Sequence, residues 1–323
     1  MEQRIFGRTQ WKVGEIGYGM WGMGGWKESD DLLSGKALDL AVENGVNFFD
    51  TAWAYGHGHS EKLLGDLLKR YPHKKIYAAS KIPAKNFQWP AKPEYRFEDS
   101  YPTLHIKEYT EKTLKNLGVE QIDLMQFHTW DDSWSDREEW QRAIEDLKAA
   151  GKIAAMGLSV NRWEPENGIK ALKTGHFDAV QVIYNIFDQA PEDTLFPLCE
   201  ALDIAIIARV PFDEGTLTGA ITKETTFAEG DWRGSYFVPE NLFASAEKAD
   251  LLRPLVPEGM TMAEMALRFI TMNTSVSTII PGMRKQRNVL MNTALSDGKG
   301  LPAELYRELK GHRWDRVPTS WSQ

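Results

Sequence analysis

The sequence has little cysteine and no long apolar run. Its 323 residues include one cysteine, Cys199, so no internal disulfide can form, which favours a reducing compartment. The opening segment MEQRIFGR has no apolar signal core, and no stretch reaches the roughly 18 apolar residues that a membrane span needs. We therefore expect a cytoplasmic protein that has no membrane partner.

The sequence also lacks an excess of positive charge. It has 38 Lys and Arg against 46 Asp and Glu, which gives a formal net charge of −8. Such a balance argues against nucleic acid or an anionic membrane as a partner, because neither offers positive charge in return. The hydrophobic share of 42% and the charged share of 26% are typical of a globular chain with a large core. The oligomeric state stays open.

Short apolar runs recur along the chain, and each is followed by an amphipathic helical pattern. We predict strands over residues 16–19, 46–49, 75–80, 122–127, 153–159, 177–184, 204–210 and 276–282. We predict helices over residues 32–44, 60–70, 107–117, 136–150, 164–173, 192–202, 261–272 and 285–294. Gly45, Gly118 and Gly151 are placed as left-handed helix ends. Eight strand–helix units predict an α/β protein, a (β/α)8 TIM barrel formed by one domain over residues 1–323.

Three segments lie outside this repeat. The N-terminal RIFGRTQWKVG alternates polar and apolar residues, so we predict a β-hairpin that closes the floor of the barrel. Residues 83–106 and 211–245 are predicted as long loops on the face that holds the carboxyl ends of the strands. Long loops inside a compact domain usually carry function.

Two motifs suggest sites that their context does not favour. Gly17, Gly19 and Gly22 match the dinucleotide fingerprint GxGxxG, but a loop follows where that fingerprint needs a helix. His57 and His59, with His128, could be metal ligands, but the first two lie in a Gly-rich turn without the helical spacing or fixed carboxylates of a metal site. We expect a Gly-rich loop and no metal ligands at these positions.

Four reactive side chains fall at successive predicted strand ends. Asp50 and Tyr55 follow the strand over 46–49, Lys81 ends the next strand, and His128 ends the one after it. In a barrel these ends open on one face. A neighbouring ammonium makes a tyrosine a better acid, a carboxylate holds that ammonium, and a histidine can orient a carbonyl. This set suits protonation of a carbonyl oxygen, and because no side chain donates hydride, a nicotinamide cofactor is implied.

At these motifs the chain resembles the aldo-keto reductases, a family of barrel enzymes that reduce aldehydes and ketones with NADPH. DTAWAYGHGHSEKLLG resembles the family's most characteristic motif, and FGRTQWKVGEIGYGMW resembles its opening segment. ASK, IDLMQFH, GLSVN, QVIYN, RVPFDEGTLTG and IIPGMRKQRNVLMN follow in the family's order. The resemblance implies a tetrad in which Tyr55 is the general acid, Asp50 and Lys81 tune it, and His128 orients the carbonyl.

The resemblance also implies the residues that bind NADP(H), with NAD(H) the less favoured alternative. Val160 stands where the family often has Asn, and Asn161 follows as the candidate second amide contact; Met291 replaces a family carboxylate. The implied cofactor residues are Gly19, Met20, Trp21, Asp50, Ser159, Asn161, Gln181, Arg209, Val210, Pro211, Phe212, Gly215, Leu217, Arg233, Gly282, Arg284, Asn288 and Asn292.

Two further patterns concern specificity. Arg284, Lys285 and Arg287 lie within four residues of an otherwise acidic chain, which suits the 2′-phosphate of NADPH, and Arg233 is placed beside them. Four tryptophans fall in predicted loops at strand ends and are predicted to wall an apolar substrate pocket, with aromatic and sugar carbonyls as candidates. They are Trp21, Trp53, Trp89 and Trp130.

Three functions remain open from the residues. The first is an NADPH-dependent carbonyl reductase, which runs in reverse as an alcohol dehydrogenase. The second is a Schiff-base aldolase, because a lysine at a barrel strand end can form an imine, here through Lys81. The third is a cofactor-binding regulatory subunit that senses redox state. The sequence does not name the physiological carbonyl.

Overall fold

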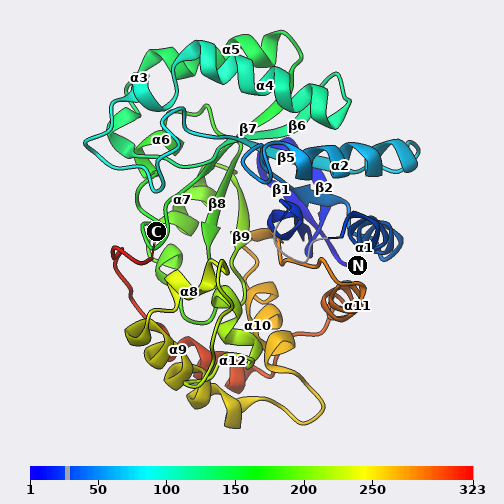
Figure 1. Cartoon of the computed structure of the whole chain (residues 1–323), viewed down its shortest axis with the longest axis vertical. Helices are drawn as coiled ribbons and strands as arrows, with labels where there is room; N and C mark the ends of the chain where they lie inside the picture. The colour runs from blue at the N-terminus through cyan, green and yellow to red at the C-terminus, as the bar shows by residue number, and fades with distance from the viewer. Residues whose placement is uncertain (26–29, 323) are drawn as a thin grey trace.

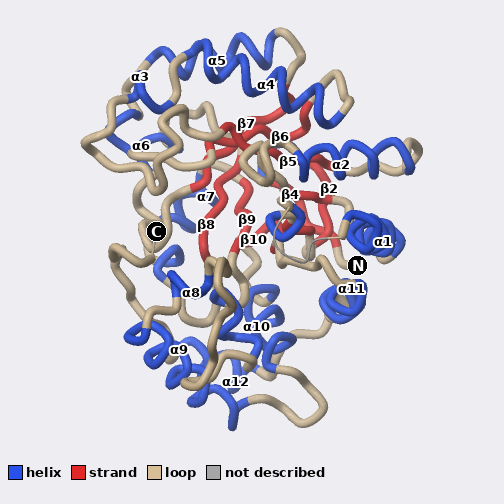
Figure 2. The backbone as a smooth tube through the Cα atoms, viewed as in Figure 1, coloured by secondary structure: helices blue, strands red, loops and turns tan. Residues whose placement is uncertain are grey.

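The computed structural model describes residues 1–25 and 30–322, and eight parallel strands lie at its centre with helices around them (Figure 2). The strands are β3 (Tyr18–Gly19), β4 (Phe48–Asp50), β5 (Tyr77–Ile82), β6 (Ile122–Phe127), β7 (Ile153–Ser159), β8 (Ala179–Ile183), β9 (Ala205–Arg209) and β10 (Val276–Ile279). Each pairs with its neighbour in chain order. Parallel bridges from Ile16 to Ile279 and from Gly19 to Gly282 join the first strand to the last. The predicted (β/α)8 barrel is confirmed.

The helices surround this barrel (Figure 1). They are α1 (Asp31–Glu43), α2 (His59–Arg70), α3 (Phe97–Ser100), α4 (Thr103–Leu117), α5 (Glu138–Ala149), α6 (Ile169–Leu172), α7 (Leu195–Ala201), α8 (Arg233–Tyr236), α9 (Pro239–Leu252), α10 (Met262–Thr271), α11 (Gln286–Ala294) and α12 (Ala303–Lys310). Short 3-10 turns span Gly7–Thr9, Trp21–Met23, Asp132–Trp134, Ala190–Glu192, Asp213–Thr218 and Arg253–Leu255. Gly45, Gly118 and Gly151 have positive φ, as predicted. Within the described residues, no helix combines the length and apolarity of a membrane span.

The floor of the barrel is an apolar layer to which the barrel strands contribute small or apolar side chains. Its members are Phe6, Val13, Phe48, Tyr77, Ala79, Leu124, Ala155, Ala179, Ala205, Ile207 and Ile280. Alternate residues of a strand point to the same side of the sheet, so each strand sends every second side chain into the interior. The small alanines leave room for the aromatic rings of their neighbours.

The N-terminal hairpin closes this floor, as predicted. Strands β1 (Gln3–Phe6) and β2 (Trp11–Gly14) pair in antiparallel register. Phe6 and Val13 are fully buried in the floor layer, and the ring of Trp11 stacks on Tyr77 at a centroid distance of 4.8 Å. The hairpin therefore keeps water from the amino ends of the strands.

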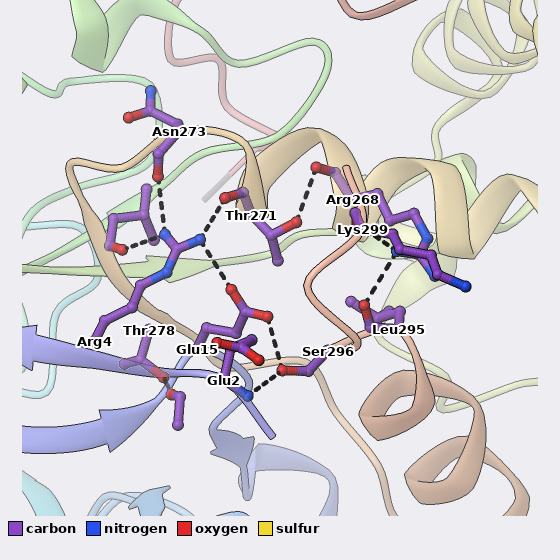
Figure 3. A network of polar contacts seen from close by, with 12 residues as sticks. Glu2, Arg4, Glu15, Arg268, Thr271, Asn273, Thr278, Leu295, Ser296 and Lys299 are labelled. Atoms are coloured by element: carbon purple, nitrogen blue, oxygen red, sulfur yellow. Dashed lines mark hydrogen bonds and ion pairs between the residues drawn. The ribbon is translucent and has the colours of Figure 1, made fainter. Parts of the chain in front are cut away.

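Polar contacts anchor the hairpin to the last units of the barrel (Figure 3). The guanidinium of Arg4 donates to the backbone oxygens of Asn273 at 2.9 Å and Val276 at 2.7 Å, and also to that of Thr271. Arg4 also forms an ion pair with Glu15 at 2.9 Å. Thr271 ends α10 and Asn273 lies just beyond it, where a helix end leaves oxygens without helical partners, and Val276 begins β10. One side chain thus caps a helix and fixes the hairpin.

Some predicted segments differ from the structure. The helix predicted over 164–173 is reduced to α6, because Pro165 has no backbone N–H to donate and Gly168 has low helix propensity. The loop predicted over 211–245 is wrong in its last part: α8 lies within it, and α9 begins at Pro239, a residue that suits the first helical position. The loop predicted over 83–106 is also wrong in its last part, which contains α3 and the start of α4. Helix α12 was not predicted.

Candidate active site

The polar residues of the barrel lie one layer above the apolar floor. Each follows a floor residue by two positions, so strand alternation places it on the same inner side of its strand. Asp50 follows Phe48, Lys81 follows Ala79, Gln126 follows Leu124, Gln181 follows Ala179, and Arg209 follows Ile207. The carboxyl ends of parallel strands lie at one edge of the sheet, which gathers these residues on one face.

A buried lysine joins Asp50 to Tyr55. The Nζ atom of Lys81 donates to the Asp50 Oδ2 at 2.5 Å, to the Thr51 backbone oxygen at 2.8 Å and to the Tyr55 hydroxyl at 3.5 Å. Lys81 is fully buried and Asp50 nearly so. All three N–H groups of the ammonium therefore face acceptors, one of which is the phenol predicted to act as the acid.

The second oxygen of Asp50 has partners that the sequence analysis missed in part. Asp50 Oδ1 accepts from the side-chain amides of Gln126 at 3.0 Å and Gln181 at 2.8 Å. Gln181 was predicted as a nicotinamide contact, whereas Gln126 was not singled out. The available signal was the glutamine near the end of IDLMQF, because a buried amide in a strand needs polar partners.

His128 completes the constellation. Its ring lies 5.6 Å from the ring of Tyr55 and 4.6 Å from that of Trp89, edge to face in both cases. The structure thus brings together all four predicted reactive residues, from the ends of β4, β5 and β6. The exposed loop residue Trp89 covers the histidine from the solvent side.

Burial and nearby charges set the protonation states of this site. Burial raises the pKa of Tyr55 above its usual value, and the Lys81 ammonium opposes this shift without reversing it. Burial, followed by the Lys81 and Arg209 charges, holds the pKa of His128 well below its usual value. At neutral pH the site therefore contains a protonated tyrosine and a neutral histidine.

The segment after β9 has strained backbone and unpaired polar atoms. Val210, Asp213 and Glu214 have φ angles of 53°, 46° and 56°, and Gly215 has 113°. A left-handed conformation is rare for a β-branched residue such as valine and is often retained at functional sites. Within the described part of the chain, Arg209 Nε, Asp213 Oδ2 and Thr216 Oγ1 are buried without a hydrogen-bond partner.

Two arginines from other segments hold these acidic residues. Arg162 forms an ion pair with Glu214, and Arg316 forms one with Asp213 at 2.7 Å. Burial, together with the charge of Arg162, lowers the pKa of Arg209 to about 10. Glu214 and Asp213 balance the charges of Arg162 and Arg316. Arg209, which has no ion pair within the described residues, is the cation that remains to meet an anionic ligand.

The basic cluster predicted at the start of α11 is available to a ligand. Arg284 is half-buried and Lys285 and Arg287 are exposed, and none of the three forms an ion pair with any residue of ranges 1–25 and 30–322. Arg233, predicted to assist them, makes a two-oxygen ion pair with Asp231. The cluster proper is therefore the run over 284–287.

The seam between β3 and β10 lies beside this cluster. A Cβ atom on Gly19 would lie 2.5 Å from the backbone oxygen of Ile280, so only glycine allows the two strands to approach so closely. Gly282, which bridges to Gly19, is exposed. Of the other residues assigned to the cofactor, Met20, Ser159, Pro211, Leu217 and Asn292 are buried, and Trp21, Val210, Phe212 and Asn288 are partly or fully accessible.

The four tryptophans do not share one environment. Trp89 is 43% exposed beside His128, and Trp53 packs edge to face on His57 at 5.3 Å. Trp21 is 39% exposed and meets the ring of Trp232 at 5.1 Å. The prediction for Trp130 is wrong.

Trp130 is fully buried away from the mouth of the barrel. Its ring packs against Phe127, Trp140 and Phe177, and its Nε1 donates to Asp132. A side chain with no exposed surface and a full set of aromatic neighbours is core. It therefore does not line a substrate pocket.

The side chain of Asn161 is also engaged elsewhere. Its Oδ1 accepts from Thr129 and from the Ala91 N–H, and its Nδ2 donates to the Ala91 oxygen and to Glu164. A primary amide has two donors and two acceptor sites, so all four are occupied. In this structure Asn161 therefore has no free amide group with which to make the predicted contact with a nicotinamide.

The chain is similar to known oxidoreductases over nearly its whole length. The model of the aldo/keto reductase family matches residues 15–313. The aldo-keto reductase YhdN of Bacillus subtilis is 32% identical over 234 residues, which cover 72% of this chain and 68% of the relative. The NADH-specific methylglyoxal reductase of Escherichia coli is 27% identical, and the match covers 96% of this chain and 98% of that relative.

Solved structures are similar too. The glycerol dehydrogenase of Gluconobacter oxydans superposes with a TM-score of 0.80 at 26% identity, covering 96% of this chain and 94% of that protein.

Proposed function

Since the chain belongs to the aldo/keto reductase family and is thus an oxidoreductase, we propose that it reduces an aldehyde or ketone to the alcohol with hydride from NADPH. The observation that carries this proposal is the Lys81 ammonium, which lies between the Asp50 carboxylate and the Tyr55 hydroxyl. This arrangement stabilises the phenolate that a proton donor must become, so it favours Tyr55 as the general acid.

The proton follows a short path. Tyr55 donates its hydroxyl proton to the carbonyl oxygen, and Lys81 stabilises the phenolate that remains. His128 is neutral, so one of its ring nitrogens can donate a hydrogen bond that orients the same oxygen. The nicotinamide, when bound, supplies the hydride to the carbonyl carbon. Tyr55 is then reprotonated from solvent, so each alcohol formed has gained one hydride and one proton.

The residues present fit a dinucleotide. The buried Nε of Arg209 and Oγ1 of Thr216 have no partner within the described ranges and would meet phosphate or amide oxygens. Gly215, with its positive φ, lets the chain turn tightly around such a group. We assign the cofactor to this segment, to Ser159 at the end of β7 and Gln181 within β8, and to the seam beside Gly19 and Gly282.

We assign NADPH as the preferred cofactor on the basis of the cationic run. Arg284 and Arg287 can give charge-assisted hydrogen bonds to a 2′-phosphate, which NADH lacks. The methylglyoxal reductase relative is described as NADH-specific, so the preference needs its own test. The double variant Arg284→Ala, Arg287→Ala should raise the KM for NADPH at least tenfold and leave that for NADH nearly unchanged. Equal effects on both cofactors would refute the assignment.

The decisive test of the reaction is Tyr55→Phe. This change removes only the hydroxyl, so we expect kcat for NADPH-dependent reduction to fall at least about a thousandfold. NADPH affinity, measured by fluorescence titration, should stay within a few-fold. Tyr71→Phe, at a partly buried position that ends α2, is the matched control and should keep full activity. An unchanged kcat in Tyr55→Phe would remove the proposed acid.

The alternative functions predict different results. A Schiff-base aldolase would form an imine on Lys81, and borohydride would then trap substrate on it. The three contacts of the Lys81 ammonium disfavour this, because a nucleophilic amine needs a free lone pair. A redox-sensing subunit would bind NADPH tightly and turn over slowly or not at all. Loss of NADPH absorbance with a panel of aldehydes, ketones and sugars separates the three.

We assign the mouth of the pocket to Trp53 and Trp89. The ring of Trp89 lies against His128 and offers exposed apolar area to a carbonyl substrate, whereas the ring of Trp53 packs on His57, Phe87 and Tyr109. Trp89→Ala should raise the KM for aromatic aldehydes. If KM is unchanged for every accepted carbonyl, the wall assignment is wrong.

A further inference from the structure

A ring of hydrogen bonds joins the segments that follow β5, β6 and β7. Thr129 Oγ1 accepts from the Ala91 N–H at 2.8 Å and donates to Asn161 Oδ1 at 2.7 Å. Asn161 closes the ring by donating to the Ala91 oxygen at 2.9 Å. Three segments far apart in sequence are thus fixed to one another by a single amide and a single hydroxyl.

A second contact holds the same place. The hydroxyl of Tyr101 donates to the Thr129 oxygen at 2.9 Å and accepts from the Thr129 N–H at 3.2 Å. Thr129, Asn161 and Tyr101 are all at most 2% exposed. Hydrogen bonds in such a site are hard to replace by water, so losing one leaves a buried group unsatisfied.

This ring lies directly behind two residues of the proposed pocket. Thr129 follows His128 in the chain, and Ala91 comes two residues after Trp89. The rings of Trp89 and His128 lie 4.6 Å apart across this connection. The position of Trp89 over His128 therefore depends on how firmly the segment at Ala91 is held.

We infer that Asn161 is a positioning residue that fixes Trp89 against His128 and so sets the affinity for carbonyl substrates with an aromatic or other apolar ring. The inference rests on the proposed function, but it assigns Asn161 to the substrate side of the site. Its amide is fully occupied by Ala91, Thr129 and Glu164, which leaves it no part in holding the nicotinamide.

The first test separates substrate from cofactor. In Asn161→Ala we expect KM for an aromatic aldehyde to rise at least fivefold, KM for a two- or three-carbon aldehyde to change less than twofold, and NADPH affinity to stay within twofold. The opposite pattern, weaker NADPH binding with unchanged substrate KM, would overturn the inference. Asn161 would then be assigned to binding the nicotinamide.

Two further variants provide an independent check and a control. Thr129→Val has nearly the same shape but breaks the same ring from the other side, so it should give the same kinetic pattern even if Asn161→Ala folds poorly. Asn167→Ala is the matched control, because Asn167 bridges Asp132 and Trp130 and makes no contact with Ala91. An equal rise of KM in Asn167→Ala would mean general loosening and would overturn the inference.

A double-mutant cycle tests the path through Trp89. If Asn161 acts by holding Trp89, the substitution Asn161→Ala should have no further effect on KM in a Trp89→Ala background. Additive effects of the two substitutions would overturn the inference.

The last readout needs no catalysis. Hydrogen exchange of the peptide containing Ala91 should be faster in Asn161→Ala than in the unsubstituted protein, and unchanged in Asn167→Ala. A protein that reduces no carbonyl would refute the proposed function while leaving this result intact. Unchanged exchange at Ala91 would refute the inference by itself, whatever the activity.

Discussion

Among single residues, Asp50 has the most closely defined surroundings. One of its oxygens accepts from Lys81 and the other from two glutamine amides, so every contact it makes requires an acceptor. This division of partners explains why Lys81 faces Tyr55 and does not turn toward solvent. In the proposed mechanism, the carboxylate acts on the chemistry through the lysine.

Asp50→Asn tests this arrangement. The new amide would place N–H groups opposite a buried ammonium or opposite glutamine donors, and Lys81 would lose its counter-charge. Removing one partner of a buried ion pair costs about 3–5 kcal/mol, so we expect lower stability in urea unfolding and kcat reduced at least about a hundredfold. Asp39→Asn, at the half-exposed pair with Arg70, is the control and should change neither.

The pH dependence follows from the two ring groups. Reduction requires protonated Tyr55, whose pKa is raised, and neutral His128, whose pKa is lowered well below the usual range. The rate of reduction should therefore be flat from about pH 6.5 to about pH 9.5 and fall above that range as Tyr55 ionises. On the acid side it should fall only below that range, where His128 becomes protonated. Alcohol oxidation needs the phenolate, so it should rise with pH over the same range. A fall in reduction with a midpoint between pH 7 and 8 would contradict these assignments.

The four residues of the proposed tetrad could be predicted to share one face. Asp50, Lys81 and His128 lie at strand ends and Tyr55 lies in the turn after β4, where sequence order fixes the face. Gln126 was missed because a single amide within a strand carries no motif. Trp130 was misplaced because a loop position in sequence does not reveal burial. The partners of Asn161 depend on contacts across 32 and 70 residues, which no local pattern encodes.

At the scale of elements, the hairpin and α10 are joined through Arg4. Its guanidinium serves three carbonyls near the end of α10 and the carboxylate of Glu15, with 19% of the side chain exposed (Figure 3). Arg4→Gln should therefore lower the free energy of unfolding by about 3 kcal/mol, because Glu15 and the carbonyls lose their partner. Lys12→Gln, on an exposed position of the same hairpin, should change it by less than about 0.5 kcal/mol.

Elements with a strong local period were predicted well. The eight strands combine β-branched runs with turn residues, and helices such as α2 and α10 have a clear apolar side. The prediction of a helix over 164–173 was wrong because it relied on the apolar spacing and gave too little weight to Pro165 and Gly168. Helix α9 was missed because Phe, Gly and Asp just before it resemble a loop, although Leu242, Ala246 and Ala249 form its buried side.

At the scale of the whole molecule, the C-terminal tail returns to the catalytic face. The guanidinium of Arg316 lies between the rings of Trp163 and Trp314, at 4.4 and 4.6 Å, and pairs with Asp188 and Asp213. Asp213 belongs to the segment that we assign to the cofactor. The last residues of the chain thereby stabilise a strained loop that begins about a hundred residues earlier.

Arg316→Met keeps the aliphatic length of the side chain and removes its charge. Asp188 and Asp213 would then be buried without a cation, so we expect the segment after β9 to loosen and NADPH affinity to fall at least fivefold. Arg313→Gln, whose ion pairs with Asp193 and Asp315 lie nearer the surface, is the control and should bind NADPH normally. Unchanged NADPH binding in Arg316→Met would separate the tail from the cofactor segment.

The scarcity of cysteine has a practical consequence. Cys199 is fully buried in α7, and burial raises the pKa of its thiol to about 12, so the folded protein should resist alkylation at neutral pH. Because there is only one thiol, any labelling reports a single event, the opening of that part of the barrel wall. The rate at which Cys199 is alkylated, measured by the mass increase of the protein, therefore reports the rate of this opening without an added probe.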